Sequence, residues 1–311
     1  MPNILDHIGN TRLLPLNRIT AANNARISLK LEAENPTGSM KDRMALAMIE
    51  AAERDGRLKA HGTVIEYTGG STGISLALVC AVKRYALKIV TSDAFAPDKL
   101  AHMKALGADL TVIPSDNGRQ TASLVKAMIA RAEEIADETG GYLTHQMENR
   151  DQLSAYRKMA DEIWAQTEGR IDALVQAVGT AASIRGLSAR LRELKPDIQI
   201  IAVEPAESPV LSGGPTGAHK IDGIGAGYIT PLWQDGIADS IERVSTEDAK
   251  TMAARLAQEE GLLPGPSTGA NVTAALRVAE LMGADAHVVT VMCDSGMKYL
   301  KTSQPTIGTT K

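Results

Sequence analysis

Thr63-Val-Ile-Glu-Tyr-Thr-Gly-Gly-Ser-Thr-Gly-Ile-Ser75 is the segment from which the architecture can be worked out. Its first five residues are mostly β-branched or aromatic and predict a buried strand. The small residues that follow predict a tight turn, and the next apolar periodic run predicts a helix over about 72–85. A strand that passes through a small-residue turn into a helix is typical of parallel sheets, which carry their ligands at the carboxyl ends of the strands.

The same alternation continues along the chain. Further strands are expected at 87–91, 109–114, 172–178, 198–203 and 287–292, and further helices at about 97–106, 119–139, 182–194, 246–260 and 268–282. This rhythm predicts an α/β protein with largely parallel sheets covered by helices on both faces. The strands and helices fall into two blocks that join near residues 147–152. The Gly- and Pro-rich stretch 207–227 is expected to be a long functional loop.

Length and charge exclude several classes of protein. A chain of 311 residues suggests about two domains. Its 33 Lys and Arg and 37 Asp and Glu give a formal charge of −4, which provides no long-range attraction for nucleic acid or an anionic membrane. The start has no apolar signal core, and no uncharged run reaches the roughly 20 apolar residues of a membrane span. We therefore expect a cytoplasmic globular protein.

Cysteine and histidine spacing offers no metal or disulfide framework. The two cysteines, Cys80 and Cys293, lie far apart, and no histidines pair at metal-ligand spacing. We expect both cysteines to be packing residues in a reducing compartment, and we expect no metal site.

The first segment that carries chemistry is Asn35-Pro-Thr-Gly-Ser-Met-Lys-Asp-Arg43. Its Pro and Gly predict a turn, and Ser39 is expected to cap a helix that runs to about residue 54. Lys41 then lies in the first turn, where the helix dipole and burial both favour a neutral amine. It is either a surface lysine at a helix start or an amine that forms a Schiff base. Asp42 and Arg43 are expected to make a helix-end ion pair or dimer contacts.

Three small-residue turns lead into predicted helices, at residues 68–72, 179–183 and 265–269. Backbone N–H groups and a helix N-terminus at such turns favour an anion. One turn of this kind is weak evidence for an anion site, because many strand–helix connections resemble it. Two of them, with Lys41 ahead of the first, suggest a ligand with separate anionic groups. Ser267 in the third turn could equally be a plain helix cap.

These segments resemble the cysteine synthase (O-acetylserine sulfhydrylase) family, whose members are fold type II enzymes that use pyridoxal phosphate. The similarity extends from Ile8-Gly-Asn-Thr-Arg-Leu13 to Asp294-Ser-Gly-Met-Lys-Tyr-Leu300, and the lysine segment is similar to the specific family motif N-P-x-G-S-x-K-D-R. The resemblance implies two α/β domains like those of the tryptophan synthase β-subunit. Each would have a mostly parallel twisted sheet flanked by helices, with the active site in the cleft between them. Residues 35–147 would form the smaller domain, and residues 1–34 with 148–311 the larger one.

The resemblance also implies residue roles. Lys41 would hold pyridoxal 5′-phosphate as an internal aldimine and later take the α-proton, and Ser267 would hydrogen-bond the pyridine nitrogen. The cofactor phosphate would be held by Gly179, Thr180, Ala181, Ala182 and Ser183. The substrate would be bound by Thr68, Gly69, Gly70, Ser71, Thr72, Gln146 and Gly225, with Ser71 also close to the cofactor.

The reaction implied is a β-replacement that makes L-cysteine from an activated serine, such as O-acetylserine, and sulfide through an aminoacrylate. A neutral hydroxyl at Ser267 makes the ring a weaker electron sink than a carboxylate partner would, which favours loss of a β-substituent over transamination. A β-elimination, a cystathionine-type replacement with another substrate, and a non-catalytic binding protein on the same fold are the alternatives. The leaving group and the sulfur donor stay open. The resemblance further implies a homodimer.

Two loops depart from the family pattern. The usual T-S-G-N-T reads Thr68-Gly-Gly-Ser-Thr72 here, so Gly69 lacks a hydroxyl and Ser71 is shorter than the Asn that reaches toward the cofactor's 3′-oxygen. The usual G-T-G-G-T reads Gly179-Thr-Ala-Ala-Ser183. We expect the two alanines to be tolerated where the backbone has no positive φ. The departures bear on the substrate more than on the cofactor.

Overall fold

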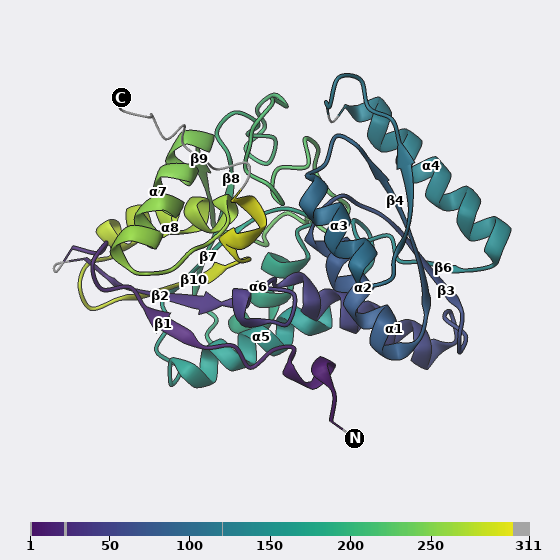
Figure 1. Ribbon diagram of the computed structural model, residues 1–311. Helices are drawn as coiled ribbons and strands as arrows, with labels where there is room; N and C mark the ends of the chain where they lie inside the picture. The colour runs from purple at the N-terminus through teal and green to yellow at the C-terminus, as the bar shows by residue number, and fades with distance from the viewer. Residues whose placement is uncertain (1, 22–23, 120, 301–311) are drawn as a thin grey trace, which may run out of the picture.

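The computed structural model describes residues 2–21, 24–119 and 121–300, and its strands form two separate sheets (Figure 1). The four-stranded sheet is parallel throughout and has the order β5-β4-β3-β6. Its strands are β3 (Thr63–Tyr67), β4 (Ala86–Ser92), β5 (Asp109–Ile113) and β6 (Tyr142–Leu143). This confirms the parallel α/β arrangement predicted around residue 63.

The six-stranded sheet has the order β1-β2-β10-β7-β8-β9, and β1 alone among these strands runs antiparallel to its neighbour. Its strands are β1 (Leu13–Pro15), β2 (Arg26–Leu31), β7 (Ala173–Ala177), β8 (Gln199–Pro205), β9 (Ser240–Val244) and β10 (His287–Met292). Every residue of β7 and β10 is buried, as expected for central parallel strands covered on both faces.

Helices cover both faces of each sheet (Figure 1). Beside the four-stranded sheet lie α1 (Lys41–Asp55), α2 (Ser71–Lys83), α3 (Pro97–Ala105) and α4 (Ala122–Thr139). Beside the six-stranded sheet lie α5 (Leu153–Gln166), α6 (Ala182–Leu194), α7 (Thr246–Glu259) and α8 (Pro266–Met282). Short 3-10 helices are η1 (Ile4–His7), η2 (Glu32–Glu34) and η3 (Gly296–Tyr299).

Helix α1 packs against both α2 and α5, so one apolar core runs from one sheet to the other. Met44 and Met48 on α1 belong to this core together with Ile74 on α2 and Tyr156 and Met159 on α5. Helices that cover the two sheets contribute to the same core. Packing in this core therefore fixes the position of one half of the molecule relative to the other.

The predicted bounds hold within a few residues for the elements named above, and the helix at 182–194 and the strand at 287–292 match throughout. Among the described strands and α-helices, β1, β2, β6, β9 and α5 were not predicted. The buried face of α5 shows the helical spacing at Tyr156, Met159, Ala160 and Ile163, so the periodic signal was present there. Within the described residues, no helix has the length and apolar character needed to cross a bilayer.

Neither Ser39, the predicted cap of α1, nor Ser267, whose role as a cap was left open, is the N-cap of its helix. The N-cap of α1 is Met40, although the Ser39 hydroxyl accepts the Lys41 N–H at 3.2 Å. The N-cap of α8 is Gly265, because Pro266 already adopts the first helical position. Ser267 therefore lies inside the first turn of α8, and the plain-cap reading of Ser267 does not apply.

Candidate active site

Lys41 begins α1, and the segment before it is held against the chain that follows β10. The Met40 N–H donates to the Cys293 carbonyl at 2.9 Å, and the Ser295 N–H donates to the Gly38 carbonyl at 3.0 Å. Burial lowers the pKa of the Lys41 amine, and this outweighs the opposing effect of the Cys293 and Asp294 side chains. A lowered pKa raises the fraction of neutral amine, which is the form that attacks an aldehyde.

Ser267 approaches the same place from α8. It is 4% exposed, and its side chain hydrogen-bonds with the Cys293 thiol. Cys293 was expected only to pack; it is buried, and its thiol also interacts electrostatically with Lys41. The lysine and the hydroxyl, far apart in sequence, therefore both interact with Cys293, the residue that follows β10.

Asn271, one turn further along α8, ties the ends of β7 and β10 together and was missed by sequence reasoning. Its Oδ1 accepts the Ala177 N–H at 2.7 Å, and its Nδ2 donates to the Val291 carbonyl at 2.9 Å. The available signal was a polar Asn among the small and apolar residues of α8. In the structure its amide is fully buried, and such a group must find hydrogen-bond partners.

The loop at 179–183 follows β7 and opens α6. Gln176 Nε2 donates to Ser183 Oγ at 3.1 Å, and Thr230 Oγ1 donates to the Thr180 carbonyl at 3.1 Å. A Cβ on Gly179 would stand 2.4 Å from the Gly223 carbonyl oxygen, so this close approach of two backbones requires glycine. The adjacent Gly225 donates its N–H to the Val178 carbonyl at 2.9 Å. These contacts fix the loop, which carries the Thr180 and Ser183 hydroxyls and the N-terminus of α6.

Ala181 has a backbone conformation that is unfavourable for alanine. It adopts φ +70° as the N-cap of α6, whereas Ala182 is helical. A left-handed conformation costs an alanine about 1–2 kcal/mol. The residue is held there by burial and by the Arg185 N–H, which donates to its carbonyl at 3.0 Å. The condition for tolerating an alanine is therefore not met at Ala181 and is met at Ala182.

The loop at 68–72 connects β3 to α2, and Gly70 is the N-cap of α2. Thr68 Oγ1 accepts the Gly70 N–H at 3.1 Å. Thr72 Oγ1 donates to Gln146 Oε1 at 2.7 Å, so the structure brings together two residues that are 74 positions apart. The Gln146 N–H in turn donates to Glu66 Oε2 at 3.0 Å, and burial raises the pKa of Glu66 to about 7.

Gly69 and Ser71, which differ from the family pattern, both contact residues that are remote in the sequence. A Cβ on Gly69 would stand 1.9 Å from Cγ of Phe95, the single Phe of the chain, so the aromatic ring fills the space of a side chain there. Ser71 Oγ receives a hydrogen bond from Lys298 Nζ at 3.2 Å and donates to Asp294 Oδ2 at 3.5 Å. Sequence reasoning missed Phe95 and Lys298, because neither lies near the loop in the chain.

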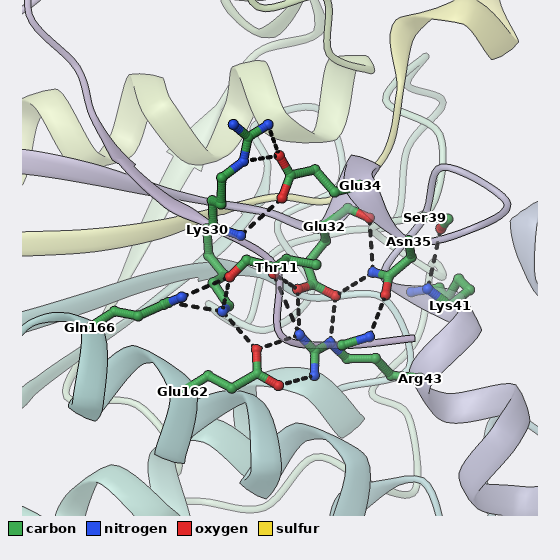
Figure 2. Close-up of polar contacts among 12 residues, drawn as sticks. Thr11, Lys30, Glu32, Glu34, Asn35, Ser39, Lys41, Arg43, Glu162 and Gln166 are labelled. Atoms are coloured by element: carbon green, nitrogen blue, oxygen red, sulfur yellow. Dashed lines mark hydrogen bonds and ion pairs between the residues drawn. The ribbon is translucent and has the colours of Figure 1, made fainter. Parts of the chain in front are cut away.

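Arg43 is the centre of a buried ion-pair network rather than a helix-end pair or a dimer contact, and that expectation is wrong (Figure 2). Its side chain is 4% exposed and pairs with Glu32 at 2.6 Å and with Glu162 at 2.7 Å. Lys30 Nζ also reaches Glu162, at 2.7 Å. Asp42 does not pair with Arg43 in this way but accepts hydrogen bonds from Thr37 and Ser75.

The chemistry of these donors fits pyridoxal phosphate. Lys41 offers an amine for the aldehyde, and Ser267 offers a neutral hydroxyl for the ring nitrogen. The hydroxyls of Thr180 and Ser183 and the N-terminus of α6 suit a phosphate with a charge near −2. In the described part of the chain, no three His, Cys, Asp or Glu side chains gather as metal ligands.

Comparison with known proteins agrees with this donor set. The family model described as "Pyridoxal-phosphate dependent enzyme" matches residues 4–294. A Staphylococcus aureus protein named cysteine synthase is 40% identical over 302 residues, which is 96% of each chain. An O-acetyl serine sulfhydrylase isoform 3 structure from Entamoeba histolytica has a TM-score of 0.91 and 36% identity over 99% of this chain and 93% of that one. An O-acetylserine dependent cystathionine beta-synthase from Helicobacter pylori has a TM-score of 0.89 and 32% identity over 97% of both chains.

Proposed function

Because the chain belongs to the family of pyridoxal-phosphate-dependent enzymes, we propose that it is a cysteine synthase that makes L-cysteine from an activated serine and sulfide. The observation that carries the proposal is that the buried Lys41 and Ser267 both interact with Cys293 at the end of β10. The high identity to a protein named cysteine synthase supports the choice of reaction within the family.

Pyridoxal phosphate, when bound, supplies an aldehyde for an amine and a ring that withdraws electrons from the substrate Cα. Lys41 would bind that aldehyde and would also serve as the base for the substrate α-proton. Its lowered pKa suits this, because a base works best when its pKa lies near the working pH. Ser267 would hold the ring nitrogen with a neutral hydroxyl, which limits how strongly that nitrogen is protonated.

We propose that the anionic groups of cofactor and substrate bind at two different helix starts. The phosphate would lie at the start of α6, against Gly179, Thr180, Ala181, Ala182 and Ser183. The substrate carboxylate would lie at the start of α2, where the contacts would come from Thr68, Gly69, Gly70, Ser71 and Thr72, with Gln146 and Gly225 alongside. Both helix starts carry positive dipole ends, which supports the assignment.

We also propose the domain division at residues 35–147 against 1–34 and 148–311. All strands of the four-stranded sheet lie within 63–143, which supports it. A homodimer and a cytoplasmic location complete the proposal. The two cysteines, Cys80 and Cys293, are both free thiols, as is usual in a reducing compartment. Sedimentation of the purified protein tests the dimer.

The resemblance to a cystathionine β-synthase supports a second candidate, in which the same activated serine reacts with a larger thiol. The altered 68–72 loop is the feature that could favour it. A related β-elimination would use the same residues and lack the second nucleophile.

The test is product analysis with the cofactor-loaded protein, O-acetylserine and sulfide, with Lys41→Ala as the control. We expect cysteine as the main product from the unchanged protein. Cystathionine formation from homocysteine at a higher rate than cysteine formation from sulfide would select the second candidate. A protein that binds no pyridoxal phosphate would remove both.

A further inference from the structure

Glu66 is a fully buried carboxyl group near the end of β3. Its Oε1 accepts the Tyr67 N–H at 2.8 Å. Its Oε2 accepts the Thr144 hydroxyl at 2.5 Å and the Gln146 N–H at 3.0 Å. These three donors are neutral groups. Burying a carboxylate among neutral donors costs folding free energy, and buried acids of this kind are concentrated at functional sites.

One oxygen of Glu66 holds the chain on both sides of a strained residue. Thr144 and Gln146 flank His145, whose backbone has φ +49°. A left-handed conformation is unfavourable for a residue that has a Cβ, so it persists only where neighbouring contacts hold it. Because Oε2 accepts a hydrogen bond from each flanking residue, Glu66 fixes this turn.

The turn in its case decides where the Gln146 side chain lies. Its N–H donates to Glu66, and its carbonyl accepts Gln152 Nε2 at 2.7 Å, so its backbone is held from both sides. Gln146 Oε1 then accepts the Thr72 hydroxyl at 2.7 Å. This contact makes Oε1 the engaged end of the amide. It leaves Nε2, which reaches the Tyr67 carbonyl only at 3.5 Å, as a donor for a ligand oxygen.

We propose that Glu66 is a positioning residue for the reaction and acts on the substrate through Gln146. The inference rests on the proposed function, because it takes Gln146 as a substrate contact. A carboxylate suits this role because both of its oxygens accept hydrogen bonds, whereas a glutamine side chain has one acceptor oxygen. An amide at position 66 would therefore leave an N–H group of the turn or of β3 without its acceptor.

The test is a double-mutant cycle on the equilibrium binding of L-serine to the cofactor-loaded protein, followed by the change in cofactor absorbance. Glu66→Gln should raise the dissociation constant about fivefold, which corresponds to the loss of roughly one hydrogen bond. Gln146→Ala should weaken binding by itself, and in that background Glu66→Gln should change the dissociation constant by less than about twofold. The control Glu53→Gln alters a carboxylate that accepts hydrogen bonds from Lys83 and Tyr85, and it should leave binding within about twofold of the unchanged protein.

Weakening by Glu66→Gln of the same size in both backgrounds would overturn the inference, because a purely structural effect does not depend on Gln146. No weakening by Glu66→Gln in the unchanged background, or none by Gln146→Ala alone, would overturn it as well.

If Glu66→Gln folds poorly, a pair of variants at Thr144 takes its place. Thr144→Val removes the hydroxyl that donates to Glu66 and should raise the dissociation constant of L-serine about threefold, whereas Thr144→Ser keeps a hydroxyl and should stay within about twofold. Equal affinities of the two variants would count against the inference. Failure of the proposed function looks different, since a protein that makes no cysteine can still show the coupling between Glu66 and Gln146, and a cysteine synthase can lack it.

Discussion

Arg43 and Glu162 are joined by two parallel hydrogen bonds, from Nη1 to Oε1 and from Nη2 to Oε2, each of 2.7 Å (Figure 2). Arg43 lies two residues after Lys41 on α1, and Glu162 lies on α5 beside the six-stranded sheet. The same guanidinium bonds to Glu32 at 2.6 and 2.8 Å. The start of α1, and with it the lysine, is therefore fixed to the other half of the molecule by a forked ion pair.

Replacing Arg43 with Met should destabilise the cofactor-free protein by about 3–5 kcal/mol, because two buried carboxylates lose their partner. Chemical denaturation of both proteins measures the free energy of unfolding. The control is Arg157→Met, which removes a surface pair with Glu193 and should cost less than about 1 kcal/mol. A cost below about 1 kcal/mol for Arg43→Met would show that the network contributes little to folding.

Replacing Lys41 with Ala should abolish both the visible absorbance of a lysine-bound aldehyde cofactor and the turnover of O-acetylserine. The physical reason is that burial where α1, the end of β10 and α8 come together lowers the pKa of the Lys41 amine, which favours its attack on an aldehyde. A matched control is Lys195→Ala, which removes a peripheral pair with Asp172 and should keep both signals. Turnover by the Lys41→Ala protein is the result that contradicts the assignment.

Replacing Gly69 with Ser should destabilise the protein by about 1–3 kcal/mol through overpacking, since the new Cβ would enter the Phe95 ring. Adding Phe95→Ala should recover part of this loss, so a double-mutant cycle should show coupling between the two positions. Gly70→Ser is the control, because its nearest neighbour would be 3.9 Å from the new Cβ. Strict additivity of Gly69→Ser and Phe95→Ala would mean that the ring moves aside freely.

Glu66 should make the protein less stable as the pH rises from about 5 to 8. Its pKa is raised by burial to about 7 in the folded protein, so between the unfolded value near 4.5 and 7 the folded state holds the proton that the unfolded state has lost. Stability falls with pH across that window, and this contribution is fully lost above it. Glu66→Gln should therefore show a smaller fall in Tm between pH 5 and pH 8 than the unchanged protein.

The control for this titration is Glu280→Gln on the surface, which should leave the pH dependence as it was. Equal slopes of Tm against pH for the unchanged protein and Glu66→Gln would show that another group governs the effect. Because Glu66 accepts the Gln146 N–H, substrate affinity should be recorded in the same series.

Much of the secondary structure and the main chemistry could be predicted locally. The β-branched runs and small-residue turns predicted β3, β4, β7 and β10 together with the helices that follow the loops. Lys41 and the two anion-type loops were also found this way. Such signals come from neighbours a few residues apart, through side-chain periodicity and turn geometry, and they need no knowledge of packing.

The partners of those loops could not be predicted, because they come from remote elements. Phe95 fills the space at Gly69, Lys298 supports Ser71, and Glu162 holds Arg43. Ala181 shows the same limit: its unfavourable backbone conformation is set by the way α6 is anchored. The residue order thus predicted most of the central strands, most of the helices and the reactive turns. Only the packing of two sheets around one shared core settled which side chains meet, since a contact across 227 residues depends on every element between them.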